Sequence, residues 1–245
     1  MGTEEGLGGP AFYALRPGGW RDLVTLLHPP YTAWHLSYVA LGAAAAPVVH
    51  VDRLLAALAA FFLAVGICAH TLDELHDRPL GTRLSDRTLT ALAAGSLAGA
   101  VAIGVAGLFI VSASLAPLVL VGAFIVVAYN LELFGGRFHS DFWFAAAWGA
   151  FPALTSYWAN ALSIRAPGLL VTAACFGLSI AQRRLSTPVR ELRRRTLSVS
   201  GEHRLTDGRV QDLSVASLAA PLDGALRAIS LALVLMAIGF VVLRL

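Results

Sequence analysis

Long apolar runs separated by short polar segments dominate the hydrophobicity pattern of this 245-residue chain. A helix needs about 20 apolar residues to cross a bilayer. Seven runs approach or reach that length, near residues 32–50, 54–72, 89–112, 115–132, 142–162, 167–183 and 225–243. The pattern therefore predicts an all-α integral membrane protein, a polytopic bundle of about seven transmembrane helices.

The polar segments divide the chain further. Residues 1–30 form an N-terminal segment, and residues 31–245 form a single transmembrane bundle with polar loops at 73–88, 133–141 and 184–211. Residues 211–224 retain apolar character but are interrupted by Pro221, Asp223 and Gly224. The pattern leaves open whether they form an interfacial helix or extend the last span.

Composition supports membrane insertion. Hydrophobic residues make up 57% of the chain and charged residues 13%, whereas an ordinary soluble domain carries about 25% charged residues. We therefore expect the lipid bilayer as a partner and no nucleic acid. The oligomeric state has no signature in the sequence.

The distribution of arginines predicts the orientation. The chain has no lysine, and 14 arginines fall in the N-terminal segment and in the loops after the second, fourth and sixth runs. Only Arg53, Arg165 and Arg244 fall on the opposite side, with Arg227 just inside the last run. By the positive-inside rule, the 14-arginine side is cytoplasmic. The protein is thus expected in the plasma membrane with its N-terminus inside and its C-terminus outside.

Charge is most concentrated where the second apolar run ends, in the segment His70-Thr-Leu-Asp73-Glu-Leu-His-Asp77-Arg78-Pro-Leu80. His70, Asp73 and Asp77 are spaced i, i+3 and i+7, so a helix presents all three on one face. Ionisable residues at such a position indicate a functional site. The alternative is a simple polar cap on a transmembrane helix.

This segment, followed by Gly81-Thr82-Arg83-Leu84-Ser85, resembles the first aspartate-rich motif of the UbiA-type intramembrane prenyltransferases. Tyr129, at the end of the fourth run, resembles the tyrosine of a second family motif, although no lysine follows it. Trp148-Gly149-Ala150-Phe151-Pro152 resembles the small-residue helix of the same family. The resemblance covers roughly residues 15–200.

The resemblance implies an isoprenoid diphosphate as substrate and a lipophilic acceptor, or cyclisation of the prenyl chain. Asp73 and Asp77 would bind Mg²⁺, which bridges carboxylates and phosphate oxygens. Arg78 or Arg83 would contact the phosphates, and His70 stands where the family has the first carboxylate. Tyr129 would stabilise a carbocation through its ring face; the alternative is a place in the interfacial aromatic belt.

The second aspartate motif of the family is missing, so the chain would be a divergent member. After the sixth run come Gln182, Ser186 and Arg190, with Arg183 and Arg184 beside them. Arg183, Arg184 and Arg190 are therefore candidate ligands of the anionic substrate; the alternative is an anchor for anionic lipids. The missing motif also keeps open a non-catalytic protein of the same fold that binds an isoprenoid or lipid, or serves in a membrane assembly.

Overall fold

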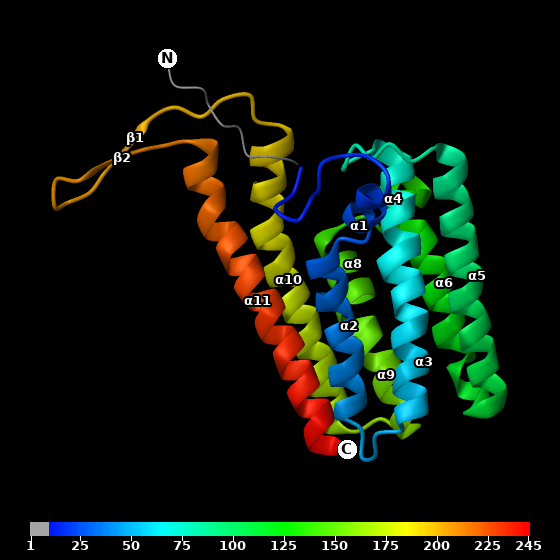
Figure 1. The fold of residues 1–245 in the computed structure, drawn as a ribbon. Helices are drawn as coiled ribbons and strands as arrows, with labels where there is room; N and C mark the ends of the chain where they lie inside the picture. The colour runs from blue at the N-terminus through cyan, green and yellow to red at the C-terminus, as the bar shows by residue number, and fades with distance from the viewer. Residues whose placement is uncertain (1–9) are drawn as a thin grey trace.

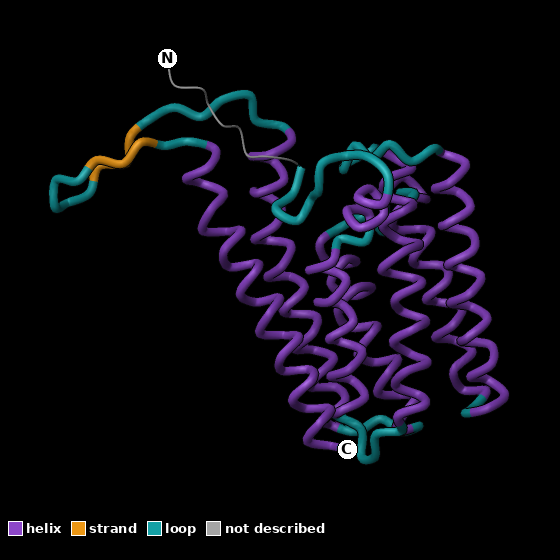
Figure 2. The backbone as a smooth tube through the Cα atoms, viewed as in Figure 1, coloured by secondary structure: helices purple, strands orange, loops and turns teal. Residues whose placement is uncertain are grey.

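The protein is described by a computed structural model that covers residues 10–245. Of the predicted N-terminal segment 1–30, residues 1–9 lie outside this range. The described chain is mostly helical, and its helices run between two ends of an elongated bundle (Figures 1 and 2). The long rods are α2 (Pro29–Ala44), α3–η1–α4 (Val51–Phe61, Phe62–Ala69 and His70–Asp77), α5 (Asp86–Ile110), η2–α6 (Ala113–Leu115 and Ala116–Asn130), α8–η3–α9 (Asp141–Phe144, Ala145–Ala150 and Phe151–Ala161), α10 (Ala166–Arg194) and α11 (Val215–Arg244).

Three short elements join these rods. The helix α1 (Trp20–Leu26) precedes α2, and the single turn α7 (Leu133–Gly136) follows α6. Between α10 and α11, β1 (Glu202–Arg204) and β2 (Val210–Asp212) pair antiparallel in a hairpin that projects away from the bundle (Figure 1).

Membrane character is evident in the helices themselves. Four described segments are long and apolar enough to cross a membrane: Val51–Asp77, Asp86–Ile110, Ala113–Asn130 and Val215–Arg244. Large apolar side chains cover their outer surfaces, and Phe109, Ile110 and Leu120 are 86%, 78% and 70% exposed. Such surfaces suit lipid and are unfavourable in water. The prediction of an all-α protein with membrane-spanning character is confirmed at this level.

The sixth predicted segment is much longer than its apolar run. Helix α10 continues past residue 183 to Arg194, with Pro188 inside it. Its buried positions include Cys175, Ser179, Gln182 and Ser186, spaced by four, three and four residues. This spacing keeps one helical face against the bundle, and because that face is small and polar, a hydropathy average misses it.

The structure also places two segments whose boundaries matter for the site and for the last helix. Helix α4 runs to Asp77, so Asp73 and Asp77 lie on a helix and the true loop is 78–85. Helix α11 begins at Val215 behind a capping box formed by Ser214 and Ser217. Because the helix begins at this cap, most of segment 211–224 belongs to the last helix.

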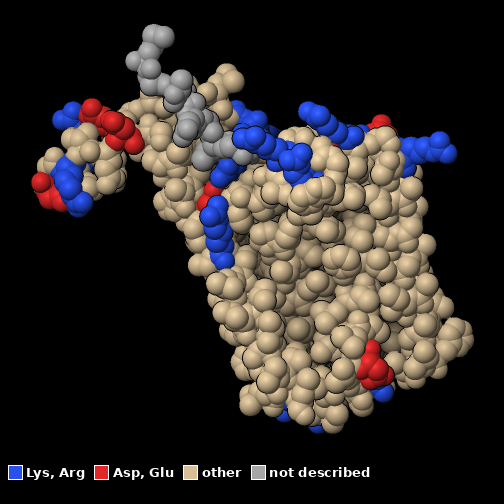
Figure 3. All heavy atoms as spheres, viewed as in Figure 1, with Lys and Arg blue, Asp and Glu red and all other residues tan. Residues whose placement is uncertain are grey.

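The buried residues form two clusters, one in each half of the bundle. One cluster joins α2, α9, α10 and α11 around Trp34, Tyr38 and Leu226. The other joins η1, α5, α6 and η3 around Val65, Ile125 and Trp148. On the face drawn in Figure 3, most basic side chains gather at one end of the bundle and few lie at the other.

Helix α2 is held against α9 by a close backbone approach at Gly42. A Cβ atom at this position would overlap the backbone carbonyl of Ala153. We expect Gly42→Ala to lower stability by about 1–3 kcal/mol, because the two helices must separate to admit the methyl group. Gly95→Ala in α5, where a Cβ meets nothing within 4 Å, is the matched control.

Thermal unfolding of the purified protein in detergent measures both variants. The control should melt at or slightly above the wild-type temperature, since alanine favours a helix over glycine. Equal melting temperatures for Gly42→Ala and wild type would contradict the tight contact.

Candidate functional site

A cavity of about 730 Å³ opens at the end of the bundle where α4 and the C-terminal half of α10 lie. Its walls come from α2, η1, α4, α6, η3 and α10, and residues 10–13 cross its mouth. Exposed charged side chains such as Asp77 lie at the mouth, and the buried part of the lining combines aromatic side chains with polar ones such as His35 and Gln182. A partly enclosed cavity of this size suits a small-molecule ligand.

Seven of the nine site residues predicted from the sequence line this cavity: His70, Asp73, Asp77, Arg78, Tyr129, Arg183 and Arg190. Arg83 and Arg184 do not line it, and both are exposed. The fold therefore brings together residues that are up to 120 positions apart in the chain.

The α4 wall carries the two carboxylates. Asp73 is half-buried and Asp77 is exposed at the mouth. Among the described residues, no ion pair involves either side chain. Their charges therefore remain available to a ligand.

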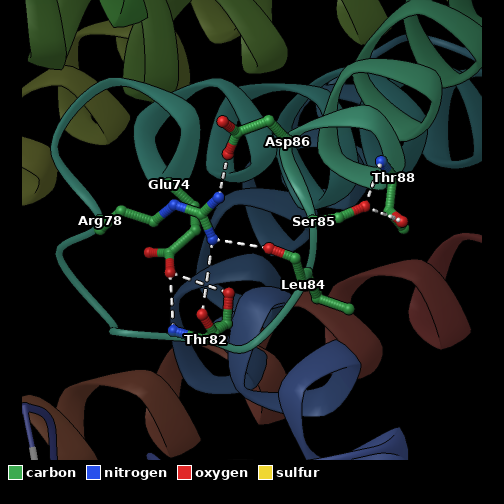
Figure 4. A network of polar contacts seen from close by, with 7 residues as sticks. All are labelled: Glu74, Arg78, Thr82, Leu84, Ser85, Asp86 and Thr88. Carbon is green, nitrogen blue, oxygen red and sulfur yellow. Dashed lines mark hydrogen bonds and ion pairs between the residues drawn. The ribbon is translucent and has the colours of Figure 1, made fainter.

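The loop that follows α4 is built on Glu74, which is fully buried. Its carboxylate accepts hydrogen bonds from the backbone N–H of Leu80 (3.0 Å) and from the backbone N–H and hydroxyl of Thr82 (both 2.8 Å). Arg78 spans the same loop: its guanidinium donates to the carbonyls of Thr82 and Leu84 and forms an ion pair with Asp86 (Figure 4). Glu74 thus fixes the rim of the cavity, and Arg78 is largely committed to structure.

The α10 wall carries arginines with different partners. Arg183 donates to Asp141 at 2.8 Å and lies over the ring of Phe144. Arg190 donates to the hydroxyl of Thr187 at 3.0 Å, within its own helix. Sequence reasoning missed Arg194, which also lines the cavity and donates to the carbonyl of Pro10 at 3.3 Å.

The deeper part of the cavity is aromatic. Tyr129 is buried, stacks on His139 at 4.6 Å between ring centroids and meets the edge of Trp148 at 5.5 Å. His35 contacts the backbone carbonyl of Trp148 at 2.8 Å. Trp148 belongs to the π-helical segment η3, and the π-helical segment η1 directly precedes His70. Such segments often occur at functional sites.

Tyr13 and His28 are further lining residues that the sequence analysis missed. The Nδ1 atom of His28 lies 2.8 Å from the Tyr13 hydroxyl, and its ring stacks on His70 at 4.1 Å. Burial, reinforced by His70 and by nearby arginines, holds the pKa of His28 well below its ordinary value, so the imidazole is neutral. Its Nε2 atom is buried and has no hydrogen-bond partner in the described chain.

Backbone strain also concentrates here. His28, Arg78 and Glu132 line the cavity and have φ values of 46°, 50° and 48°. Non-glycine residues in this left-handed region are uncommon and cluster at functional sites.

Few of the described side chains around the cavity are arranged to bind a metal ion. Within residues 10–245, no group of three or more His, Cys, Asp or Glu side chains is arranged to hold a metal ion. Mg²⁺, however, is commonly bound by one or two carboxylates together with substrate phosphates and waters. Asp73 and Asp77 fit a metal of that kind, one that arrives with a phosphorylated ligand.

No family model, curated protein or solved structure matches the chain. The resemblance to the prenyltransferases therefore rests on the sequence motifs alone.

The substitution Glu74→Gln tests whether Glu74 stabilises the loop 78–85 at the rim of the cavity. One carboxylate oxygen of Glu74 faces Leu80 and the other faces Thr82, so either orientation of the amide places an NH₂ group against a backbone donor. We expect a loss of about 1.5–3 kcal/mol, the scale for a buried hydrogen bond to a charged group. The measurements are thermal unfolding and hydrogen exchange of residues 78–85.

Asp86→Asn is the matched comparison, because it removes the exposed partner of Arg78. Exposed ion pairs contribute about 0–1 kcal/mol. A larger effect for Asp86→Asn than for Glu74→Gln would show that the rim depends on Arg78 instead.

Proposed function

We propose that the protein is a membrane-embedded enzyme of the UbiA prenyltransferase type. It acts on an isoprenoid diphosphate at the cytoplasmic face and transfers the prenyl group to a lipophilic acceptor, or cyclises it. The observation that carries this proposal is the cavity at the polar end of apolar helices, which combines two unpaired carboxylates with an aromatic interior.

In this proposal all seven helical rods cross the bilayer. Four rods have the length and hydropathy of spans on their own; α2, α10 and the α8–η3–α9 rod pack among them and bury polar residues such as His35 and Gln182. The gathering of arginines at the cavity end supports a cytoplasmic mouth. The plasma membrane is the proposed location.

The diphosphate occupies the charged mouth. Asp73 and Asp77 would hold Mg²⁺, which supplies charge neutralisation to the departing diphosphate when bound. Tyr129 and Trp148 present aromatic surfaces deeper in the cavity, where positive charge develops on the prenyl group once the allylic C–O bond breaks.

A second cavity supports an apolar tail on the substrate. It has a volume of about 110 Å³, lies among η1, α5, α6 and α9, and is lined almost entirely by apolar side chains. Val65 and Trp148 border both cavities. A ligand with a charged head and an apolar chain would fit this succession of environments.

A second candidate is a non-catalytic protein that binds an isoprenoid or a lipid in the same cavity. The α10 wall favours it, because no aspartate of α10 complements Asp73 and Asp77. The two functions differ in turnover: the enzyme releases pyrophosphate from geranylgeranyl diphosphate, and the binding protein retains the intact ligand.

Neutralising the carboxylates tests the proposed site. Asp73→Asn and Asp77→Asn should each abolish the Mg²⁺-dependent part of geranylgeranyl diphosphate binding, because the metal loses a charged ligand. Calorimetric titration with and without Mg²⁺ measures this. Asp52→Asn in the first turn of α3, outside the cavity lining, is the control and should bind as wild type does. Unchanged Mg²⁺ dependence in both site variants would reduce the cluster to a helix cap.

Reporter fusions test the orientation. A reporter active only outside the cytoplasm should give a signal when fused after Leu245 and none when fused after Arg209, because α11 separates the two positions. The reverse pattern would place the cavity mouth outside the cell. It would contradict the proposal that the enzyme binds its diphosphate substrate at the cytoplasmic face.

A further inference from the structure

Two arginines of α10 stand out from the others around the cavity. Arg190 and Arg194 are four residues apart, so they project from the same helix face one turn apart, and both line the cavity. Arg190 is half-buried, and Arg194 is exposed at the mouth. Like charges at this spacing repel each other, so the arrangement favours an anion between them.

Neither arginine has an acidic partner among the described residues. Each has a neutral oxygen as its hydrogen-bond acceptor: the Thr187 hydroxyl for Arg190 and the Pro10 carbonyl for Arg194. The neighbouring Arg193 instead points to α11, where it forms a buried ion pair with Asp223 at 2.5 Å. Arg183 is likewise held by Asp141. The acidic partners of Arg193 and Arg183 are thus committed, whereas Glu191 of α10 also lines the cavity and forms no ion pair among the described residues.

No ion pair among the described residues compensates this positive charge, although Asp73 and Asp77 of α4 line the same cavity. A guanidinium stays protonated in proteins, so Arg190 keeps its charge inside the cavity. Tyr31 of α2 and Tyr129 of α6 also line the cavity, and a tyrosine side chain ordinarily carries no charge at neutral pH.

We propose that Arg190 and Arg194 bind the diphosphate oxygens of the substrate directly, from a different wall of the cavity than the one that carries Asp73 and Asp77. Guanidinium groups suit this task because they present paired donors to phosphate oxygens. The assignment deepens the proposed function and rests on it for the identity of the substrate. It implies that the diphosphate binds even when no divalent metal is present.

The same phosphate chemistry occurs in lipid head groups, so the test separates the two sources. The full-length protein is placed in phosphatidylcholine nanodiscs with EDTA, and binding of inorganic pyrophosphate and of geranylgeranyl diphosphate is titrated. Wild type should bind both ligands. Arg190→Gln and Arg194→Gln should each weaken both by about 10–150-fold, the range for one charge-assisted contact.

Two further variants sharpen the result. Arg190→Lys should recover part of the loss, because a lysine keeps the charge but not the paired donors. Arg87→Gln removes an exposed arginine of α5 that does not line the cavity, and it should stay within about twofold of wild type.

Three outcomes would overturn the assignment. Metal-free binding within about twofold of wild type in both glutamine variants would exclude a direct contact. An equal loss in Arg87→Gln would show only a diffuse effect of charge. Displacement of pyrophosphate by added phosphatidylglycerol, abolished in Arg190→Gln, would assign the pair to a lipid head group.

If the proposed function is wrong, the binding experiments should give a different set of results. In that case the arginine variants still lose pyrophosphate binding, but geranylgeranyl diphosphate binds no tighter than pyrophosphate and Asp73→Asn has no effect with Mg²⁺. That result would support the arginine site for a diphosphate while rejecting the prenyl substrate.

Discussion

The backbone contact between α2 and α9 at Gly42 is the constraint on which the cavity depends. It brings α2 close enough to share one buried cluster with α9, α10 and α11. The N-terminal half of α2 then meets the other half of the bundle, where His35 reaches the carbonyl of Trp148 and His28 stacks on His70. A helix separated by one methyl group would disturb all of these contacts, since interiors are closely packed.

Polar groups inside a membrane bundle must find partners within the protein. Some charged groups near the cavity follow this rule: Glu74 receives three hydrogen bonds from its loop, and Arg193 pairs with Asp223. Asp73 on α4 and Arg190 on α10 have no ion-pair partner in the described chain and line the same cavity from two different helices. A ligand that carries phosphates and a bound cation would pair with Arg190 through the phosphates and with Asp73 through the cation.

Hydropathy was sufficient to predict the ends of a helix that faces lipid, and insufficient to predict those of a helix that faces other helices. The apolar run of α5 is predicted within three residues at each end, because its outer surface is apolar. Helix α10 was predicted to end near residue 183, yet it continues for eleven residues. Its inward face is a line of small and polar residues such as Ser179 and Ser186, whose burial depends on neighbouring helices.

The sequence by itself determined the helical class, the membrane character and the spacing that puts Asp73 and Asp77 on one helix face, because each follows from local periodicity. From the sequence, Arg183 and Arg190 are both candidate ligands of the anionic substrate. Only the tertiary structure decided that Asp141, 42 positions from Arg183, neutralises it and leaves Arg190 unpaired. It also brought Tyr13 and His28 to the cavity. Ion pairs between distant segments, and the burial of their side chains, depend on how the helices pack. Local sequence patterns do not determine that packing.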